Sequence, residues 1–200
     1  MHISRESTPK QWSIPRKGTK YVVRPSSNLS KGVPLLIVIR DILKVARNRK
    51  EVKIAINSGN IIVNSKKPKN EKHSLSLFDV LEIVPEKKYY ILTLNEKGKF
   101  SLKETSHEKS KMKISKIIGK KVMKGKKIQV NMFDGRNLLY DKPCSVNDSL
   151  LINLAGKKIE KVIPLKKGAT IFVFDGKHAG DEGVLMEFDD KKKMVNVQSK

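Results

Sequence analysis

Apolar residues in the segment 33–47 recur at spacings of four, three and four positions, which places them on one helical face: Leu35, Ile39, Ile42 and Ala46. Basic residues recur in the same way on another face: Arg40, Lys44 and Arg47. Pro34 suits the first helical turn, where its missing N–H leaves no hydrogen bond unmade. The pattern therefore predicts one amphipathic helix from Val33 to Arg47.

A second, shorter helix is predicted to begin after Asn48, whose side chain suits the N-cap position. Glu51, three residues on, completes a pattern similar to the capping box, although that box begins with Ser or Thr. Gly59 suits the left-handed residue that ends a helix. The inward face is predicted to hold Val52, Ala55 and Ile56, and Arg49 and Lys53 are expected to be more exposed.

Two short strands are predicted after this helix. Ile61–Val63 is β-branched throughout, Asn64 and Ser65 predict a turn, and Phe78–Val84 forms the returning strand. The polar loop 65–74 between them is rich in lysine and has two interpretations: a solvated loop or a phosphate contact through Lys66, Lys67, Lys69 and Lys72. The segment 33–86 is thus predicted to hold two short helices beside a small sheet.

The stretch 87–166 alternates short apolar runs with turn residues, as β-hairpins do. Asn95–Gly98 and Ala155–Lys158 are its hairpin turns. The strands predicted around these and further turns are Tyr89–Leu94, Lys99–Lys103, Ile114–Val122, Ile128–Phe133, Leu150–Leu154 and Ile159–Ile163. This stretch is therefore predicted to be a β-domain.

The last segment predicts three more strands, with a turn at Asp189 and Asp190 before the third: Ile171–Phe174, Val184–Phe188 and Met194–Val197. A loop with regularly placed glycines joins the first two and contains Gly176, Gly180 and Gly183. Glycines permit positive φ and the close approach of a phosphate backbone. The loop is therefore either a nucleic-acid contact or a tight connection in a small barrel without a ligand.

The first 32 residues lack periodicity and carry seven basic residues against one acid, Glu6. Trp12 lies among these charges, and basic residues interleaved with an aromatic ring suit phosphate contact combined with base stacking. The alternative is that Trp12 anchors this arm on the protein's own core. We expect such an arm to be mobile alone and ordered on RNA.

Lysine and arginine outnumber aspartate and glutamate by 43 to 20, which gives a net charge of +23. So large a charge repels itself in the folded state and favours a polyanionic partner. Nucleic acid is favoured over a membrane surface, because the basic residues are spread along the chain rather than gathered on one amphipathic helix. The longest apolar run, Val33–Ile39, is too short to span a bilayer, and Met1–Lys10 has no signal-peptide segment.

No pattern for catalysis or metal binding stands out. Cys144 is the single cysteine, which excludes a disulfide or cysteine-based zinc site within the chain and fits a reducing compartment. The four histidines lie in separate segments without metal-ligand spacing. The segment from Gly119 is only superficially similar to a phosphate-binding loop. Five residues separate Gly119 from Gly125, where that loop has four, and Lys127 stands where the loop has the Ser or Thr that binds magnesium. We therefore expect neither an enzyme nor a cofactor.

The segment Asn48–Val52, followed by Ile56–Asn64, resembles the S4-type RNA-binding domain. That family's pattern runs from a basic residue at the start of the second helix, through an apolar pair and a glycine, to a strand end of Val-Asn-Gly. Ser65 stands where the pattern has glycine, so the turn is expected to differ. The resemblance implies RNA binding by the two basic helices.

Further stretches resemble the S4e family of archaeal and eukaryotic small-ribosomal-subunit proteins. The opening does so through Met1–Arg5, Pro9–Trp12 and Arg24–Ser26, and the central domain through Val146–Leu150. The turn Asn28–Lys31 departs from the family's Gly-Pro-His turn. The last segment, with Gly168 and the loop glycines in place, resembles the KOW motif of ribosomal and transcription factors.

These patterns and resemblances predict an α+β, mainly β protein in four parts: a basic extended N-terminal arm 1–32, an S4-type RNA-binding domain 33–86, a central β-domain 87–166 and an SH3-like KOW unit 167–200. The resemblance implies a structural constituent of the small ribosomal subunit, in the cytoplasm, with ribosomal RNA and neighbouring ribosomal proteins as partners. No membrane, metal, cofactor or small-molecule substrate is expected. The alternatives are a non-ribosomal S4/KOW RNA-binding factor of translation or transcription and an S4-domain RNA-modifying enzyme.

The residues predicted to contact RNA are Arg5, Lys10, Trp12, Arg16, Lys17, Lys20, Arg24, Arg40, Lys44, Arg47, Arg49, Lys53, Lys66 and Lys177, beside the loop glycines Gly176, Gly180 and Gly183.

Overall fold

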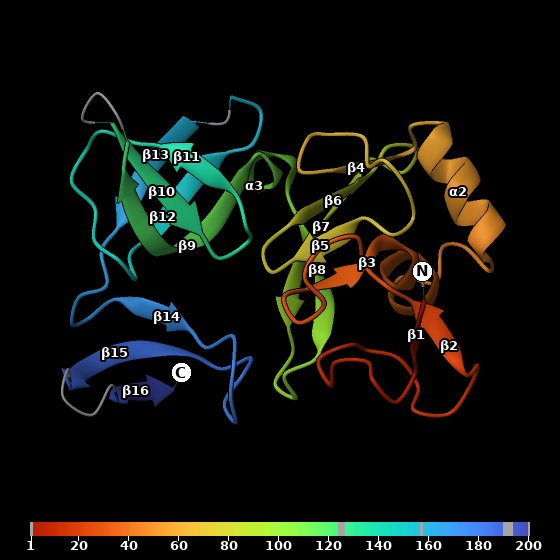
Figure 1. Cartoon of the computed structure of the whole chain (residues 1–200), viewed down its shortest axis with the longest axis horizontal. Coiled ribbons are helices and arrows are strands. Elements are labelled where there is room, and N and C mark those ends of the chain that lie inside the picture. The colour runs from red at the N-terminus through yellow and green to blue at the C-terminus, as the bar shows by residue number, and fades with distance from the viewer. Residues whose placement is uncertain (1, 124–126, 157, 190–193, 200) are drawn as a thin grey trace. The chain divides into compact units, whose positions relative to one another are not determined.

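The computed structural model describes residues 2–123, 127–156, 158–189 and 194–199 of the chain. The chain divides into two compact units, Met1–Lys111 and Met112–Lys200 (Figure 1). Antiparallel strands make up most of the regular structure in both units, and the helices of the described residues lie in the first. The predicted α+β, mainly β fold class is therefore confirmed at this level.

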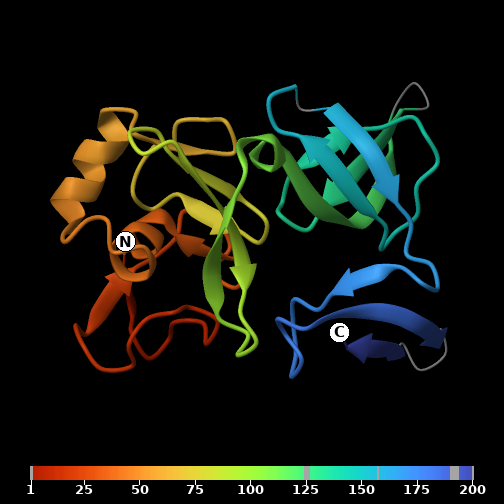
Figure 2. The ribbon, with the colours of Figure 1, turned by 180° about the vertical axis from the view of Figure 1, so that it is seen from behind.

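The first unit is built on a four-stranded antiparallel sheet. Its strands, in spatial order, are β4 (Ile61–Val63), β6 (Val80–Ile83), β7 (Lys88–Leu94) and β8 (Phe100–Thr105). The hairpin predicted from Asn95–Gly98 forms between β7 and β8, the long yellow-green pair in Figure 2. From the sequence this hairpin is expected in the central β-domain, whereas the pairing of β7 with β6 joins it to the sheet of the first unit.

The segment predicted as one helix from Val33 to Arg47 is helical over a shorter range. Gly32–Pro34 is a strand, β3, which pairs with β5 (Ser74–Ser76). Helical backbone covers α1 (Leu35–Ile37) and the π-helical turn η1 (Val38–Ile42).

Two physical causes limit this helix. Val33 and every residue from Leu35 to Ile39 are at most 2 % exposed, and Pro34 is also buried, so the segment is enclosed on all sides rather than amphipathic. At the other end Lys44 has a φ of +58°, a left-handed conformation that a continuing right-handed helix cannot contain. The prediction of an amphipathic helix reaching Arg47 was therefore wrong, because burial by the surrounding chain overrides the local spacing.

The second helix agrees with the prediction. It is α2 (Arg49–Asn57), with Val52 and Ile56 buried, and Gly59 after its end has a φ of +76°. In Figure 1 α2 lies at the edge of the first unit, next to the coil of η1. The apolar spacing and the terminal glycine together determine this element.

A tight turn connects β4 to the polar loop. Val63 and Lys66 exchange two backbone hydrogen bonds of 2.8 and 2.9 Å, and the residues between them, Asn64 and Ser65, have φ angles of +50° and +60°. This is a two-residue turn with both central residues left-handed, the type that favours Asn-Gly. The geometry explains why the S4-type pattern has glycine at the position of Ser65.

The N-terminal arm is folded onto the first unit. Its strands β1 (His2–Ser4) and β2 (Tyr21–Val23) pair antiparallel. The prediction of an extended arm is therefore replaced by a small hairpin-like element.

A short helix, α3 (His107–Ser110), follows β8 near the end of the first unit.

The second unit begins with a five-stranded antiparallel sheet in the spatial order β11, β10, β9, β12, β13. The strands are β9 (Met112–Val122), β10 (Ile128–Met132), β11 (Asn137–Leu139), β12 (Ser149–Asn153) and β13 (Lys158–Ile163). Its core is a cluster of five buried side chains: Ile117, Val130, Met132, Leu150 and Ile152. Four of these strands agree with the sequence-based prediction within one or two residues.

A second sheet of three antiparallel strands completes this unit: β14 (Thr170–Phe172), β15 (Glu182–Asp189) and β16 (Met194–Ser199). These correspond to the three strands predicted for the last segment. Asp190 of the predicted turn, like Lys157 of the predicted hairpin turn, lies outside the described residues.

Candidate nucleic-acid interface

The start of α2 is closed by a hydrogen-bond network that leaves basic side chains outside. The Asn48 Oδ1 accepts the backbone N–H of Glu51 at 3.0 Å, and its Nδ2 donates to Glu51 Oε1 at 2.7 Å. Glu51 Oε2 accepts the backbone N–H of Arg47 at 2.7 Å, one residue before the N-cap. The reciprocal cap expected from Asn48 and Glu51 is therefore present, and it fixes the backbone on which Arg47 is exposed.

Arg49, on the first turn of α2, forms an ion pair with Glu71. Its Nε lies 3.0 Å from Glu71 Oε1, and the Glu71 side chain is only 6 % exposed. Burial raises the pKa of the Glu71 carboxyl. The Arg49 guanidinium, a backbone hydrogen bond and the charge of Lys53 together lower this pKa by more than burial raises it, so the carboxyl has a pKa below its usual value. The Arg49 guanidinium is therefore already paired with a carboxylate of the same chain.

The basic face predicted for the first helix does not form. Arg40 makes a two-point pair with its neighbour Asp41, with Nε to Oδ1 at 3.0 Å and Nη2 to Oδ2 at 2.9 Å. The hydrogen bond to Asp41 raises the pKa of Arg40. Lys44 and Arg47 lie after the helix, in the connection to α2.

Three exposed cations nevertheless remain close in the chain. Lys44 and Arg47 precede α2 and Lys53 lies on it, and all three side chains are exposed. We call these three residues the basic corner. It replaces the two helical faces predicted from the sequence, since Arg40 and Arg49 are paired with carboxylates.

Trp12 lies inside the first unit. It is 2 % exposed, and its Nε1 donates a 3.1 Å hydrogen bond to the backbone carbonyl of Gly32. The neighbouring residue Gln11 accepts the N–H of Phe100 at 2.7 Å, and Ser13 Oγ donates to the carbonyl of Phe100. A ring enclosed in this way has no face on which a base can stack, so the structure supports the alternative interpretation of Trp12 as a core anchor.

Arg5 is engaged within the arm. Its guanidinium donates to the carbonyls of Thr19 and Pro15 at 2.7 and 2.6 Å, and to Thr19 Oγ1 at 3.0 Å. These bonds close the loop between β1 and β2 and leave Arg5 few donors for phosphate. The other basic residues predicted to contact RNA from the arm are all exposed: Lys10, Arg16, Lys17, Lys20 and Arg24.

Tyr21 is the exposed aromatic residue of the arm, with 52 % of its surface accessible. The His2 ring packs against it with 4.5 Å between ring centroids, and Lys20 Nζ lies 5.6 Å from the centre of the Tyr21 ring. A cation beside an exposed ring suits a phosphate next to a base. Residue type alone favoured Trp12, and no sequence signal separates it from Tyr21. In the structure Tyr21 is exposed, whereas Val22, the next residue of β2, is buried.

Two of the three predicted loop glycines have the positive φ expected of them. Gly176 has a φ of +90° and Gly180 of +105°, whereas Gly183 is buried in β15 opposite Ile171. His178 Nδ1 lies 3.3 Å from Asp181 Oδ2 within the loop. The glycines at the start and centre of the loop therefore serve its backbone, whereas Gly183 belongs to the strand and not to the loop.

Lys66 and Lys177 are the remaining predicted RNA contacts. Lys66 is exposed after the Asn64–Ser65 turn, and Lys177 is exposed in the loop that begins at Gly176. They belong to different units of the chain.

The segment similar to a phosphate-binding loop has a different local structure. Gly119 lies in β9 opposite Asn131, and Gly125 lies outside the described residues. Among the described residues no group of three or more His, Cys, Asp or Glu side chains is arranged to hold a metal ion. In the same part of the chain no helix has the length and apolar character needed to cross a membrane.

Comparisons with known proteins point to one family. The family model described as "Ribosomal family S4e" matches residues 86–159. The small ribosomal subunit protein eS4 of Methanococcus maripaludis is 34 % identical over 202 residues, covering 95 % of this chain and 82 % of that protein. The eS4 protein of Archaeoglobus fulgidus is 34 % identical, covering 94 % of this chain and 80 % of its own length. The crystal structure of the 30S ribosomal protein S4e from Thermoplasma acidophilum matches with a TM-score of 0.74 and 27 % identity, covering 84 % of this chain and 88 % of that one.

Proposed function

The chain belongs to the S4e family of small-ribosomal-subunit proteins, and from this membership we propose that it is a structural constituent of the small subunit that binds ribosomal RNA and supports translation. The observation that carries the proposal is the similarity to eS4 proteins, 34 % identity over 95 % of the chain. The relatives are ribosomal structural proteins, so the prediction that the chain is not an enzyme is confirmed.

The proposed mechanism is that folded units hold cations in a fixed pattern against RNA phosphates. Each Lys or Arg that meets a phosphate releases condensed counterions, which favours binding and makes it dependent on salt. A net charge of +23 supplies many such contacts. Since the deep major groove of an RNA helix is closed to side chains, we expect the contacts to follow backbone shape rather than base sequence.

Within this mechanism a set of exposed cations supplies the proposed contacts. They are the basic corner of Lys44, Arg47 and Lys53, the exposed lysines and arginines of the arm, and Lys66 and Lys177. Tyr21 with Lys20 joins them as a stacking position. Arg5, Arg40 and Arg49 contribute less, because hydrogen bonds within the chain already use their donors.

We propose the following domain roles for the structural elements. The segment 33–86, with the helix–turn–strand order of α2, β4 and β6, supports an S4-type RNA-binding domain, which the β7–β8 hairpin extends. The five-stranded sheet is the central β-domain. The strands β14 to β16 with the Gly176–Gly183 loop support a KOW unit. Neighbouring ribosomal proteins and a cytoplasmic ribosome complete the proposed setting.

Sucrose-gradient fractionation of cells that express the chain tests the proposal. A structural constituent stays with small subunits when the gradient contains high salt, because many phosphate contacts must break together. A translation or transcription factor that cycles on and off its target would leave the small-subunit fractions at the same salt. Loss from these fractions at moderate salt would contradict the proposal and favour such a factor.

A further inference from the structure

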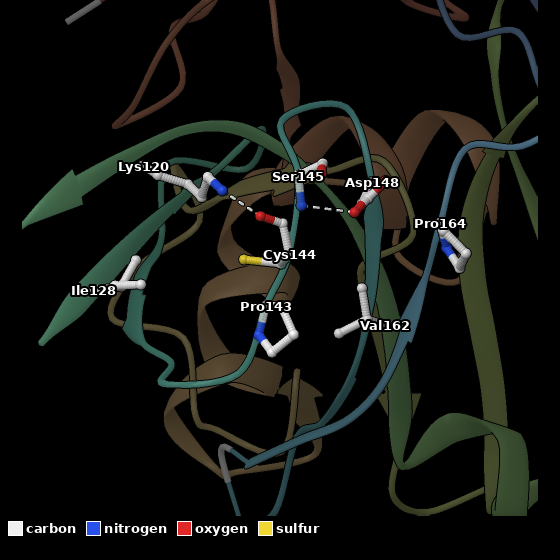
Figure 3. Close-up of a pocket in the computed structure, with 8 residues that line it drawn as sticks. All are labelled: Lys120, Ile128, Pro143, Cys144, Ser145, Asp148, Val162 and Pro164. Carbon is white, nitrogen blue, oxygen red and sulfur yellow. Dashed lines mark hydrogen bonds between the residues drawn. The ribbon is translucent and has the colours of Figure 1, made fainter.

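The second unit contains an open pocket of about 450 Å³ at one end of the five-stranded sheet (Figure 3). Its apolar walls are Ile128 of β10, Pro143 after β11, and Val162 and Pro164 at the end of β13. This volume lies within the range of about 300–1,000 Å³ that is usual for ligand pockets. Nothing in the proposed function uses this pocket.

The acidic group in the pocket already has partners. Asp148 is 8 % exposed, and its Oδ2 accepts the backbone N–H of Ser145 at 2.7 Å while Oδ1 accepts the N–H of Leu165 at 3.1 Å. The carboxylate therefore fastens the two chain segments of the pocket rim to each other. Because both oxygens are engaged, a ligand meets mainly the apolar walls and the remaining cation.

That cation is Lys120 of β9. Its Nζ donates to the backbone carbonyl of Cys144, the bond marked by a dashed line in Figure 3. Among the described residues no carboxylate pairs with Lys120, so its charge is not compensated. An ammonium group held by a neutral carbonyl at the edge of an apolar pocket can still bind an anionic group of a ligand.

Exposed lysines precede two of the lining residues outside the strands: Lys127 precedes Ile128, and Lys142 precedes Pro143. Apolar walls beside one cation match a ligand that has a flat, weakly polar body and a phosphate. The additional lysines match anionic groups that continue beyond a single nucleotide.

We propose that this pocket receives one unstacked nucleotide of an RNA strand. The base packs against Ile128, Pro143 and Val162, and its phosphate meets Lys120. Lys127 and Lys142 hold the backbone next to it. The inference rests on the proposed RNA binding and adds which feature of the RNA is recognised, namely a base displaced from its helix. RNA bases are usually accessible to proteins in this unstacked form. Since the walls touch the face of the base rather than its edges, little base preference is expected.

Cys144 provides a reporter in the unmodified full chain. It is the single cysteine and lines the pocket, so the rate of its alkylation by N-ethylmaleimide reports whether the pocket is filled. The probes are an RNA hairpin with one bulged nucleotide, the same hairpin without the bulge, the same hairpin with an abasic bulge, and free adenosine monophosphate. RNA binding itself is measured separately by filter binding for each probe.

We expect the bulged hairpin to slow alkylation of Cys144, and the unbulged and abasic hairpins to bind without slowing it. The base should raise affinity about fivefold, because packing its face against aliphatic side chains removes apolar surface from water. If all hairpins bind and none protects Cys144, or all protect it equally, the pocket proposal is overturned while RNA binding stands. If adenosine monophosphate protects and the bulged hairpin does not, the pocket is a site for free nucleotides and the proposal is also overturned. If no hairpin binds, the proposed function itself fails.

A matched pair of variants checks the role of Lys120. Lys120→Ala should remove most of the affinity difference between the bulged and unbulged hairpins. Lys158→Ala makes the same change of charge at the start of β13, the end of the strand away from the lining residue Val162. It should lower the affinity for both hairpins equally. Equal effects of the two variants on the bulge difference would overturn the placement of the phosphate at Lys120.

Discussion

Lys113 and Asp134 form a buried ion pair in the second unit. Lys113 Nζ lies 2.6 Å from Asp134 Oδ2, and the two side chains are 1 % and 4 % exposed. Lys113 points to the same face of the sheet as Ile152, its cross-strand partner in β12. On the opposite face of β9, Met112 and Ile114 are 38 % and 40 % exposed.

This arrangement reverses the usual pattern of a half-buried strand. A shift of the pairing by one residue would turn Met112 and Ile114 inward and Lys113 outward. Hydrophobicity alone would favour this shifted register over the observed one. The ion pair opposes that shift, because Lys113 reaches Asp134 only in the observed register. We therefore infer that the pair specifies the strand register at a cost in burial.

Lys113→Met should destabilise the second unit by about 3–5 kcal/mol, because the buried carboxylate of Asp134 loses its main partner. The double variant Lys113→Met with Asp134→Leu should recover most of that loss, since no buried charge remains. Chemical denaturation followed by circular dichroism measures both. A double variant as unstable as the single one would show that the charge on Asp134 is not the cause.

The Glu71–Arg49 pair predicts a stability that depends on acid. The folded-state pKa of Glu71 is lowered, so the pair contributes stability above the unfolded pKa of about 4.3 and loses it as the pH falls through the folded-state value. Glu71→Gln should be less stable than the parent near neutral pH and lose less stability on acidification. Urea midpoints across the acid range measure this difference. Glu86→Gln, at an exposed pair with Lys88, is the control and should leave the pH dependence nearly unchanged.

Trp12→Ala should destabilise the first unit by about 3–5 kcal/mol, because a large buried ring is replaced by a cavity. Trp12→Phe should cost less, since it keeps most of the volume and loses the hydrogen bond to Gly32. Thermal unfolding measures both. Trp12 is the single tryptophan, so its fluorescence should stay unchanged when RNA binds. Strong quenching by RNA would return Trp12 to the list of stacking residues.

Ser65→Gly should stabilise the first unit by about 1 kcal/mol, because glycine adopts the φ of +60° without the clash of a Cβ atom. Asn64→Gly is the matched control at the neighbouring left-handed position. It should destabilise, since the buried Asn64 amide accepts the N–H of Val80 at 3.0 Å and donates to Asp79 at 2.7 Å. Denaturation midpoints compare the two, and stabilisation by both would mean that the Asn64 side chain is dispensable.

The basic corner predicts a salt-dependent loss of RNA affinity. Lys44→Ala combined with Arg47→Ala should weaken binding to a duplex fragment of small-subunit RNA and reduce the slope of log affinity against log salt by about 0.7–0.9 for each lost contact. Arg40→Ala removes a charge already paired with Asp41 and should change the slope less. Binding titrations at several salt concentrations distinguish these outcomes. Equal slopes for all three proteins would place the RNA elsewhere on the first unit.

The features predicted correctly from the sequence depend on residues close together in the chain. The N-cap of α2 joins Asn48 to Glu51, and Gly59 ends that helix with a positive φ. The hairpin turns and most strands of the second unit follow from turn residues between apolar runs. Such features arise from contacts over a few residues, and the local sequence therefore determined them.

The candidate site was predictable only in part. Exposed cations such as Arg47 and Lys53 were identified from composition and helical spacing. Which cations remain available was decided by partners elsewhere, because Arg49 meets Glu71, 22 positions away. Local spacing carries no information about such a partner.

Burial and register were likewise decided by the tertiary structure. Enclosure of Val33–Ile39 shortened the first helix, and Trp12 was buried against Gly32 while Tyr21 remained exposed. The direction in which Lys113 and Ile114 point depends on the buried partner Asp134. The sequence by itself thus determined the kind of elements, the excess of positive charge and the family resemblance. Only the tertiary structure determined which side chains face inward, because burial and charge pairing arise from segments that the chain brings together when it folds.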